Sequence, residues 1–335
     1  MIAKLLRNAL VCAALVLLLG VSWFTVHFYN PHKKTAEEII FEVRKGDTAE
    51  GIARNLKDKG LIQLKVIFIL GYKFFFSPRS LKAGEYAFHL PVSTKGILEM
   101  ITEGRVMLHP ITIPEGLTRK EIAQHLQTIS SVHLDEFLSI SQCTAFIEDM
   151  DPEAFDLEGY LFPETYHFGK EFGAEDIVSA MVSQFRSIFR NQWQKRTEEL
   201  GMTVREVVTL ASLIEKETSL PEERPVVSSV FHNRLEKGMK LDCDPTIIYA
   251  LKKEGKFKDR LRTKDLRYDS PYNTYLYPGL PPGPIANPGQ GSLRAALYPA
   301  ETDFYYFVSR NDGSHYFSQT FREHQNAVIK YQKRR

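Results

Sequence analysis

The sequence predicts an α+β protein with a single N-terminal transmembrane helix, a small α+β subdomain, and a larger, mostly helical domain with a Pro/Gly-rich loop region. Three observations predict this fold class. They are an uncharged apolar run near the N-terminus, a strand-turn-helix pattern that occurs twice, and a series of amphipathic segments followed by a tail rich in Pro, Gly, Tyr and Asn. We expect the boundaries at residues 1–34, 35–106 and 107–335. The 43% apolar and 25% charged residues are typical of a folded protein.

Charge and cysteine usage exclude several classes of function. The net charge of +2 gives no signal for a polyanionic partner, so no nucleic acid is expected. Cys12, Cys143 and Cys243 show no metal-ligand spacing, although the last two could pair in an oxidising compartment. His232 and His315 have no partners at ligand spacing. We therefore expect no metal site.

The first element is a membrane anchor. Residues 8–26 contain no charge, and a helix of that length, at about 1.5 Å per residue, just crosses a hydrocarbon core roughly 30 Å thick. A cleaved signal peptide is the alternative, but the run is long for one and "SWFTVHFYNP" offers no small-x-small cleavage site. Lys4 and Arg7 favour a cytoplasmic N-terminus, which places the rest of the chain outside. Aromatic residues at the far end suit the membrane interface: Trp23, Phe24, Phe28 and Tyr29.

The small domain contains the first copy of a repeated pattern. "VRKGDTAEGIARNL" (residues 43–56) and "IPEGLTRKEIAQHL" (113–126) each combine a β-prone segment, a Gly, a Thr that caps a helix, and the sequence Ile-Ala-x-x-Leu. The pattern resembles the opening strand-turn-helix of LysM modules, which bind glycans of cell walls. It is also a common structural device, so glycan binding stays open. We further expect a core helix over 64–76, a strand around 86–89 and a helix over 94–103 that ends at Gly104.

The larger domain is predicted to be mostly helical. Tyr- and Phe-rich segments in the tail indicate two strands, and the stretch "DLEGYLFPETYHF" indicates a loop. The expected elements are a strand over 108–113, helices over 118–128, 133–141, 174–199, 203–217 and 222–237, strand-like segments within 304–309 and 315–320, and a last helix over 321–333.

Two carboxylates near the end of the helix over 203–217 differ in their environment. In a helix with about 100° per residue, Glu217 lies on the apolar stripe of Leu210, Leu213 and Ile214. Glu215 lies on the opposite face and is expected to be a solvated surface acid. A carboxyl group on an apolar face has a raised pKa, as a general acid for glycosidic bond cleavage requires. The alternative is a structural Glu that pairs with a buried Arg or caps a neighbouring helix.

At this point the residues carry a family resemblance. "LEGYLFPETY", "TLASLIEKET", "FHNRL", "DPTIIYAL", "SPYNTYLYPGLPPGPIANPG" and "SLRAALYPA" resemble the YceG/MltG family of endolytic murein transglycosylases, in family order and over most of the chain outside the anchor. "EKET" also resembles the "RQES" of soluble lytic transglycosylases, whose Glu is catalytic. That alignment selects Glu217, with Glu215 as the fallback.

The resemblance implies a reaction and a location. A lytic transglycosylase cleaves the MurNAc–GlcNAc β-1,4 bond without water, and the product ends in 1,6-anhydro-MurNAc. One carboxyl group suffices because the nucleophile, the C6 hydroxyl, belongs to the substrate. The family implies a single-pass protein of the bacterial inner membrane with its catalytic domain in the periplasm, where glycan-strand termination would take place. It implies no cofactor, and partners among cell-wall synthases beside the glycan strands.

The remaining site residues are expected in loops. The residues expected to bind substrate through hydroxyl, amide, aromatic and carboxylate groups are Tyr272, Asn273, Thr274, Tyr275, Asn287 and Glu164. A surface clamp is the alternative for this Pro/Gly loop. Asn233 and Arg234 could buttress Glu217, with a structural role favoured for Arg234.

Two other functions stay open. A glycoside hydrolase would need a second carboxylate roughly 5–10 Å away, for which Asp244 or Glu164 are candidates. Asp244 precedes Pro245 and is more readily interpreted as the N-cap of a helix, and Glu164 could cap a turn after Pro163. The other function is a non-enzymatic, wall-binding scaffold.

Overall fold

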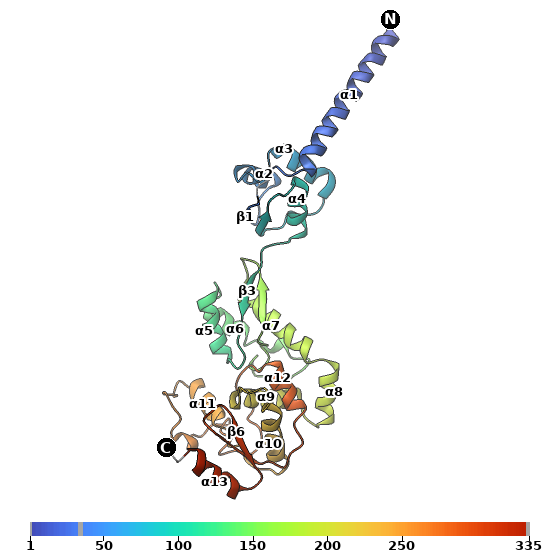
Figure 1. Ribbon diagram of the computed structural model, residues 1–335. Helices are drawn as coiled ribbons and strands as arrows, with labels where there is room; N and C mark the ends of the chain where they lie inside the picture. Colours follow the sequence, from blue (N-terminus) through green and yellow to red (C-terminus); the bar gives the residue numbers. More distant parts are fainter. Residues whose placement is uncertain (1, 33–35, 333–335) are drawn as a thin grey trace. The chain divides into compact units, whose positions relative to one another are not determined.

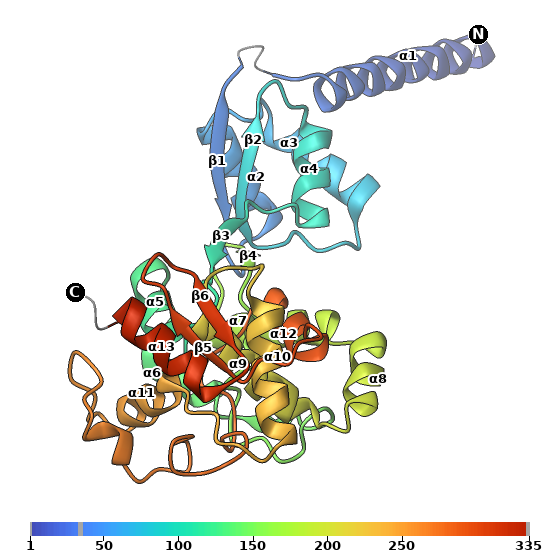
Figure 2. The same ribbon diagram turned by 60° about the horizontal axis from the view of Figure 1, so that its bottom comes forward.

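The computed structural model describes residues 2–32 and 36–332, which form two compact units (Figures 1 and 2). The first unit comprises Met1–Pro110 with His167–Glu171, and the second comprises Ile111–Tyr166 with Phe172–Arg335. Helices predominate, and the sheets in the described residues are two-stranded. The mixed helix-and-sheet fold and its single N-terminal apolar helix are thus confirmed, whereas the likeness to LysM stays a prediction. The boundaries expected after residues 34 and 106 also stay predictions.

The N-terminal helix α1 (Ile2–Tyr29) is long and apolar enough to cross a membrane. Only its last turns join the core of the first unit. There Phe28 is 1% exposed and lies against Gly71, where an added Cβ would come within 2.3 Å of the Phe28 ring. Glycine at position 71 is therefore what allows the end of α1 to dock.

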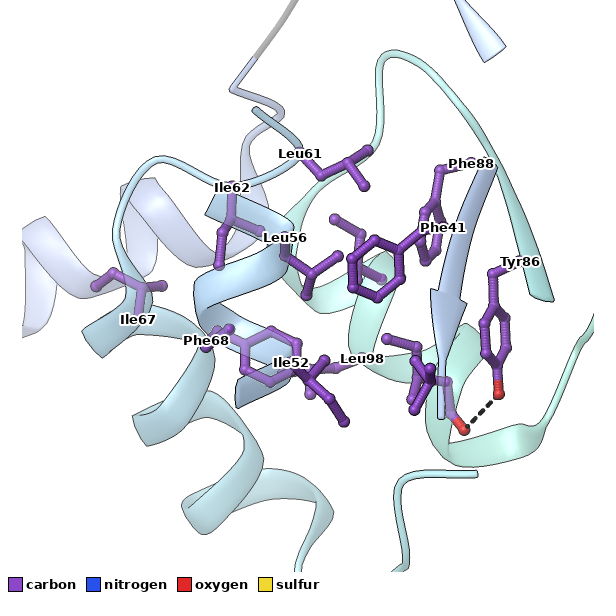
Figure 3. Close-up of a cluster of buried hydrophobic side chains, with 14 of the residues drawn as sticks. Phe41, Ile52, Leu56, Leu61, Ile62, Ile67, Phe68, Tyr86, Phe88 and Leu98 are labelled. Atoms are coloured by element: carbon purple, nitrogen blue, oxygen red, sulfur yellow. Dashed lines mark hydrogen bonds between the residues drawn. The ribbon is translucent and has the colours of Figure 1, made fainter. Parts of the chain in front are cut away.

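The first unit packs helices against a two-stranded antiparallel sheet. Strands β1 (Glu38–Val43) and β2 (Gly84–His89) are antiparallel, with Phe41 opposite Tyr86. Apolar side chains from both strands and the helices fill one core (Figure 3). The helices of this unit are α2 (Ala49–Asp58), α3 (Lys65–Gly71), the π-helical turn η1 (Tyr72–Phe76) and α4 (Thr94–Glu103).

Most local predictions for this unit are confirmed. The Thr48 hydroxyl accepts the Gly51 amide at 3.2 Å and caps α2, and Gly104 ends α4 with φ 76°. The core helix expected over 64–76 is only partly correct, because it becomes a π-helix at Tyr72. Phe76 is buried, while Phe74 and Phe75 are exposed. A helix buries one face, so three consecutive Phe cannot all reach the core.

The second unit is mostly helical, as expected. Strands β3 and β4 pair with each other, and β5 and β6 form an antiparallel pair. The residues of β3 (His109–Thr112) and β4 (Thr165–Phe168) are divided between the two units. The other elements of the second unit are α5 (Arg119–Ile129), α6 (Leu134–Ile140), η2 (Thr144–Phe146), α7 (Ala174–Ile188), α8 (Asn191–Glu199), α9 (Val204–Glu217), α10 (Arg224–Glu236), α11 (Asp244–Lys253), η3 (Asp265–Arg267), α12 (Gln290–Leu297), β5 (Tyr306–Ser309), β6 (His315–Ser318) and α13 (Phe321–Gln332).

Helix α9 lies at the centre of this unit (Figure 2). Every residue from Val207 to Ile214 is buried, and α8, α10, α11 and α12 pack against it. Thr203 and Glu206 cap its start reciprocally, since the Thr203 hydroxyl accepts the Glu206 amide at 3.2 Å and the Glu206 carboxylate accepts the Thr203 amide at 2.7 Å. A capped, fully enclosed helix is a rigid support for the residues at its end.

Three features differ from the sequence predictions. The single helix expected over 174–199 is wrong, because the chain leaves the helix at Phe189 (φ −88°, ψ 58°). Across the break, Phe185 stacks on Phe189 with ring centroids 5.5 Å apart, and Phe189 meets Trp193 edge to face at 5.9 Å. The apolar pattern is therefore continuous there, and no Gly or Pro marks the break. Strand β4 and helix α12 lie in segments that were expected to be irregular.

Replacing Gly71 by Ala tests the docking of α1. The added methyl group would overlap the Phe28 ring, so we expect Gly71→Ala to lower the stability of the first unit by about 1–3 kcal/mol. The measurement is amide hydrogen exchange in α3 and α4 of the full chain. Gly20→Ala is the matched control, because nothing lies within 4 Å of its added Cβ. Equal protection in both variants would contradict the inferred contact.

Candidate active site

Glu217 is the last residue of α9 and is only partly exposed to solvent. Its carboxyl group accepts a hydrogen bond from the Cys243 thiol, with Sγ 2.9 Å from Oε1. The pKa of Glu217 is raised to about 7, mainly by burial; the Cys243 hydrogen bond, His315 and Arg234 oppose the increase, and the charge of Asp244 adds to it. The group is thus part protonated near neutral pH, and part of its surface faces solvent.

Cys243 is held in place as a hydrogen-bond donor. Its amide donates to Thr274 Oγ1 at 3.0 Å, and its carbonyl accepts the Thr246 hydroxyl at 2.7 Å. Burial and the neighbouring Glu217 raise the pKa of the thiol well above its usual range. The thiol therefore stays protonated at neutral pH and can donate to the carboxylate without becoming a nucleophile.

Arg234 supports the turn that precedes Cys243. Its guanidinium donates to the carbonyls of Leu241 at 2.9 Å and Tyr305 at 2.6 Å, and it pairs with Asp242 at 3.3 Å. The favoured structural role of Arg234 is therefore confirmed, and its positive charge also favours the ionised form of Glu217. Asn233 donates to two carbonyls, those of residues 302 and 304, and has no described contact with Glu217.

His315 and Glu223 form a second support beside the end of α9. His315 Nδ1 lies 2.6 Å from Glu223 Oε2, and the His315 amide donates to Oε1 at 2.8 Å. The Thr218 hydroxyl donates to the same Glu223 carboxylate at 3.3 Å. Sequence reasoning missed this link, because the two residues are distant in the chain and no local spacing connects them.

Asp244 has a different position from the expected one. The N-cap of α11 is Cys243, no side chain caps that helix, and Asp244 is its first residue, so the N-cap interpretation is wrong. Its carboxylate accepts the Tyr275 hydroxyl at 2.7 Å. Tyr275 therefore holds an exposed acid whose charge reaches Glu217.

Glu215 is buried, which contradicts the expected solvated acid. Its side chain is 7% exposed, Arg224 Nη2 lies 3.3 Å from Oε1, and the Gly289 amide donates to Oε2 at 3.0 Å. Helix α12 packs on α9, and the chain before it donates backbone amides to Ser212 and Glu215 of α9. Both carboxylate oxygens of Glu215 are thus bonded, unlike the carboxyl group of Glu217.

Glu158, in the stretch "LEGYLFPETY", is a further buried carboxyl group that sequence reasoning did not single out. Burial raises its pKa to about 8, and the charge of Asp156 adds to this. Its Oε1 accepts the Arg119 amide at 2.9 Å and the Asn287 side-chain amide at 3.0 Å, and Oε2 accepts the Tyr249 hydroxyl at 3.4 Å. Glu158 therefore ties three segments together.

Asn287 makes side-chain hydrogen bonds to protein atoms. Its Oδ1 accepts the amides of Gly159 and Leu161, both at 2.9 Å, and its Nδ2 donates to the Leu117 carbonyl as well as to Glu158. The residue is 1% exposed. Its expected contact with substrate stays a prediction, and the structure gives it a role in joining the loop to the segment 117–161.

The residues of "PYNTY" divide between two surroundings. Tyr272 packs on Tyr249 with ring centroids 5.0 Å apart, and burial raises its pKa to about 12. Asn273 is fully buried and donates to the carbonyls of residues 266 and 268. Thr274 and Tyr275, by contrast, contact the segment beside Glu217 through Cys243 and Asp244. Substrate binding by all four stays a prediction.

Glu164 lies apart from these contacts. It is exposed just before β4, and its Oε1 accepts the Thr165 amide at 3.0 Å. No described contact joins it to Glu217. Its expected role at the substrate also stays a prediction.

The chain is similar to one family of proteins. It matches the YceG-like family over residues 41–330. An endolytic murein transglycosylase of Bacillus subtilis is 34% identical over 315 residues, which cover 89% of this chain and 86% of the relative. That of Streptococcus pneumoniae (strain D39) is 29% identical over 86% of this chain, which spans 57% of its length. The crystal structure of a YceG-like protein of Listeria monocytogenes aligns with TM-score 0.59 and 34% identity, covering 88% of this chain and 100% of that one.

The raised pKa of Glu217 makes a prediction about stability. A carboxyl group whose pKa is higher in the folded than in the unfolded chain stabilises the fold at low pH, and this contribution is lost as the pH rises through about 7. The Gln side chain does not titrate, so the free energy of unfolding of Glu217→Gln, relative to that of the native chain, should be about 2 kcal/mol more favourable at pH 8 than at pH 5. Chemical denaturation of the detergent-solubilised chain at both pH values measures this. A difference that does not change with pH would contradict the assigned pKa.

Replacing Glu215, in contrast, should destabilise the fold. Glu215→Ala leaves Arg224, whose side chain is 13% exposed, without its buried partner. We expect a loss of about 2 kcal/mol in the free energy of unfolding, because the Gly289 amide and Arg224 lose a buried acceptor and only the more exposed Glu115, 3.3 Å from Arg224 Nη2, still pairs with that arginine. The same denaturation experiment checks it, with Glu222→Ala on the exposed surface as the control. A cost as small as that of the control would mean that the ion pair is unimportant.

Proposed function

This chain belongs to the YceG-like family, and from that premise we propose that it is a lytic transglycosylase that cleaves the glycan strands of peptidoglycan. The curated relatives are named endolytic murein transglycosylases, which are lytic enzymes of this kind. The bond cleaved would be the β-1,4 linkage between MurNAc and GlcNAc, with 1,6-anhydro-MurNAc as the new end.

The observation that carries the proposal is the state of the Glu217 carboxyl group. It has a pKa of about 7, it is partly exposed, and its one described hydrogen bond comes from a thiol. Glu215 and Glu158 are also buried, but protein donors occupy their oxygens. Of these three acids, Glu217 is thus the one with described hydrogen-bonding capacity left for a substrate. A pKa near the working pH suits a group that must both give and take a proton.

In the proposed reaction, protonated Glu217 donates its proton to the glycosidic oxygen as the bond from that oxygen to C1 of MurNAc breaks. The C6 hydroxyl of the same MurNAc then attacks C1. Its proton passes to the Glu217 carboxylate, which restores the acid. One bond breaks and one forms, and no water is consumed. A single carboxyl group acting first as acid and then as base therefore balances the reaction.

Neighbouring charges would keep Glu217 suited to both steps. Burial and Asp244 favour the protonated acid, whereas Cys243, His315 and Arg234 favour the carboxylate. The Glu223–His315 pair holds the imidazole in place near the end of α9. We propose positioning roles for these groups, because only Glu217 would touch the reacting atoms.

The loop residues would act at two levels. Tyr275 and Thr274 lie beside the Glu217 environment, where Tyr275 is part exposed and could meet a sugar. Tyr272, Asn273 and Asn287 are buried, and their side chains bind the protein, so they would shape the loop. The exposed Glu164 would meet only a more distant part of the strand.

The proposed location is the periplasmic side of a bacterial inner membrane. Helix α1 is a candidate anchor, and Lys4 and Arg7 at its start favour a cytoplasmic N-terminus. Cleavage of nascent strands there would end glycan polymerisation, beside the synthases that make them. The first unit, with its LysM-like strand-turn-helix, would contact the same glycan.

The test is a product analysis with purified uncrosslinked glycan strands. We expect the native chain to produce anhydro ends and Glu217→Gln to lose at least about a thousandfold in rate, because proton transfer and bond cleavage share this one group. Asp244→Asn and Glu164→Gln should retain cleavage. Mass spectrometry of the chain ends, with thermal unfolding of each variant as the check on folding, measures this.

Other products would point to other functions. Free reducing ends, lost with Asp244→Asn or Glu164→Gln, would indicate a hydrolase with a second carboxylate. Asp244 is the better candidate, because its charge acts on Glu217. Binding of the glycan strands by the native chain and all variants, with cleavage by none of them, would indicate a wall-binding scaffold. If Glu215→Gln folds normally but makes no anhydro ends, while Glu217→Gln still makes them, the catalytic role would belong to Glu215.

The Cys243 hydrogen bond predicts a shift in the pH profile. Cleavage needs protonated Glu217, so the rate should fall as the pH rises through about 7. Cys243→Ala removes a donor that stabilises the carboxylate, so the pKa of Glu217 should rise and the alkaline limb should move to higher pH. Cys243→Ser keeps a donor and is the control. The measurement is the initial rate between pH 5 and pH 9, and a limb that moves to lower pH would contradict the role of the thiol.

A further inference from the structure

Two phenylalanines of the first unit lie open to solvent beside the end of α1. Phe74 is 71% exposed and Phe75 is 58% exposed, both in the π-helical turn η1. Phe74 is the most exposed large apolar side chain in the described residues outside α1. Single exposed apolar residues are normal on proteins, but adjacent aromatic rings next to an apolar helix indicate a surface with a partner.

The aromatic rings of η1 and α1 are in contact. The Phe75 ring stacks on Phe28 with centroids 5.4 Å apart and planes at 23°, and on Phe24 at 6.2 Å and 22°. The exposed turn therefore lies along the side of α1, at its C-terminal end.

The level of this contact along α1 can be read from the sequence. The uncharged run extends to Val26, and Phe24 lies two residues before its end, which is about 3 Å of helix. If α1 spans a bilayer, Phe24 lies at the outer edge of the hydrocarbon. Phe75, stacked on it, reaches the same level.

The packing fixes η1 at this level. Phe28 is buried against Gly71, the residue before η1, and Phe76 at the other end of the turn is buried in the core. The Thr94 hydroxyl also donates to the His27 carbonyl at 3.4 Å. The end of α1 and η1 are therefore parts of one packed core, and the unit follows the helix.

The chemistry of the turn matches the interfacial layer of a membrane. Trp and Tyr prefer the level of the lipid headgroups, and Phe inserts at the boundary between headgroups and acyl chains. Trp23 and Tyr29 of α1, 47% and 49% exposed, lie at the same end of the helix. Exposed Lys73 and Arg79 flank the two phenylalanines and suit lipid phosphates.

We propose that Phe74 and Phe75 insert into the outer interfacial layer of the bilayer that α1 spans, so that the first unit rests on the lipid surface. This inference rests on the proposed membrane anchoring by α1. Lipid is the occupant that the structure favours, because the exposed rings continue the apolar surface of α1.

The test places fluorescent labels in the full chain, reconstituted into vesicles of phosphatidylethanolamine and phosphatidylglycerol. The background is Cys12→Ser with Cys143→Ser, in which Cys243 stays buried. A single cysteine then replaces Phe74, Leu15 in α1, or Lys45. Lys45 lies in the turn that follows β1, at the end of the strand opposite to the linker from α1. Each is labelled with a small environment-sensitive dye. Quenching is measured with lipids spin-labelled near the headgroup or deep in the chain, and with a water-soluble quencher.

We expect the Phe74→Cys label to lose most of its emission with shallow spin-labelled lipid and little with the water-soluble quencher. The Lys45→Cys label should show the reverse, and the Leu15→Cys label should respond to the deep lipid. Phe74→Trp provides a second measurement in the otherwise native chain. Brominated lipid should quench more tryptophan emission in this variant than in the native chain, which has two tryptophans.

The outcomes separate the two proposals. Deep quenching at residue 15 with water-soluble quenching at residue 74 would overturn the inference and leave the anchor intact. A label at residue 74 that neither lipid nor the water-soluble quencher reaches would indicate that this residue is buried against another copy of the chain and would also overturn the inference. Absence of lipid quenching at residue 15 would overturn the anchor itself, and the glycan-cleavage assay is independent of all three results.

Discussion

The second unit depends on one constraint: helix α9 is buried at every residue from Val207 to Ile214 and ends at the carboxyl group of Glu217. Because the helix cannot shift, the position of Glu217 is fixed by the core and not by a flexible loop. Burial withdraws its carboxyl group from water and raises its pKa to about 7, and one thiol at 2.9 Å compensates only in part. Glu215, two residues earlier, is buried as well, but Arg224 and a backbone amide satisfy it. Satisfaction by protein donors, more than burial, separates the structural carboxylate from the candidate catalyst.

The surroundings of Glu217 come from distant parts of the chain. Cys243 is the N-cap of α11, His315 begins β6, and Arg234 reaches from α10 to the turn that precedes Cys243. Their effects on the pKa of Glu217 oppose those of burial and Asp244. Such a balance keeps both protonation states accessible, which a proton donor that later acts as acceptor requires. The Pro/Gly-rich loop contributes mainly by holding these elements in place, since its buried amide and hydroxyl groups bind the protein.

The first unit shows how one contact can link a helix to a folded domain. Phe28 fits over Gly71 because that residue has no Cβ, and the rings of Phe24, Phe28 and Phe75 then stack in sequence. The end of α1 is thus part of the core of the unit. A domain joined in this way keeps a fixed orientation to its helix, whereas a flexible linker would leave that orientation open. In the proposed membrane setting, the same contact sets the height of the unit above the lipid.

Local signals determined much of this protein. The uncharged run, the capping residues Thr48 and Thr118, and the apolar stripe that includes Glu217 all act within a few residues, so the sequence alone predicts the apolar helix, most secondary structure and the carboxyl group on a buried face. The sequence alone did not predict the break at Phe189, because the apolar pattern continues through it. The sequence alone also could not predict that Glu215 is buried. Its face of α9 would be solvated in an isolated helix, but here α12 and the chain before it pack on α9. Only the tertiary structure brought Cys243 to Glu217, since a hydrogen bond between distant segments leaves no periodic trace in either.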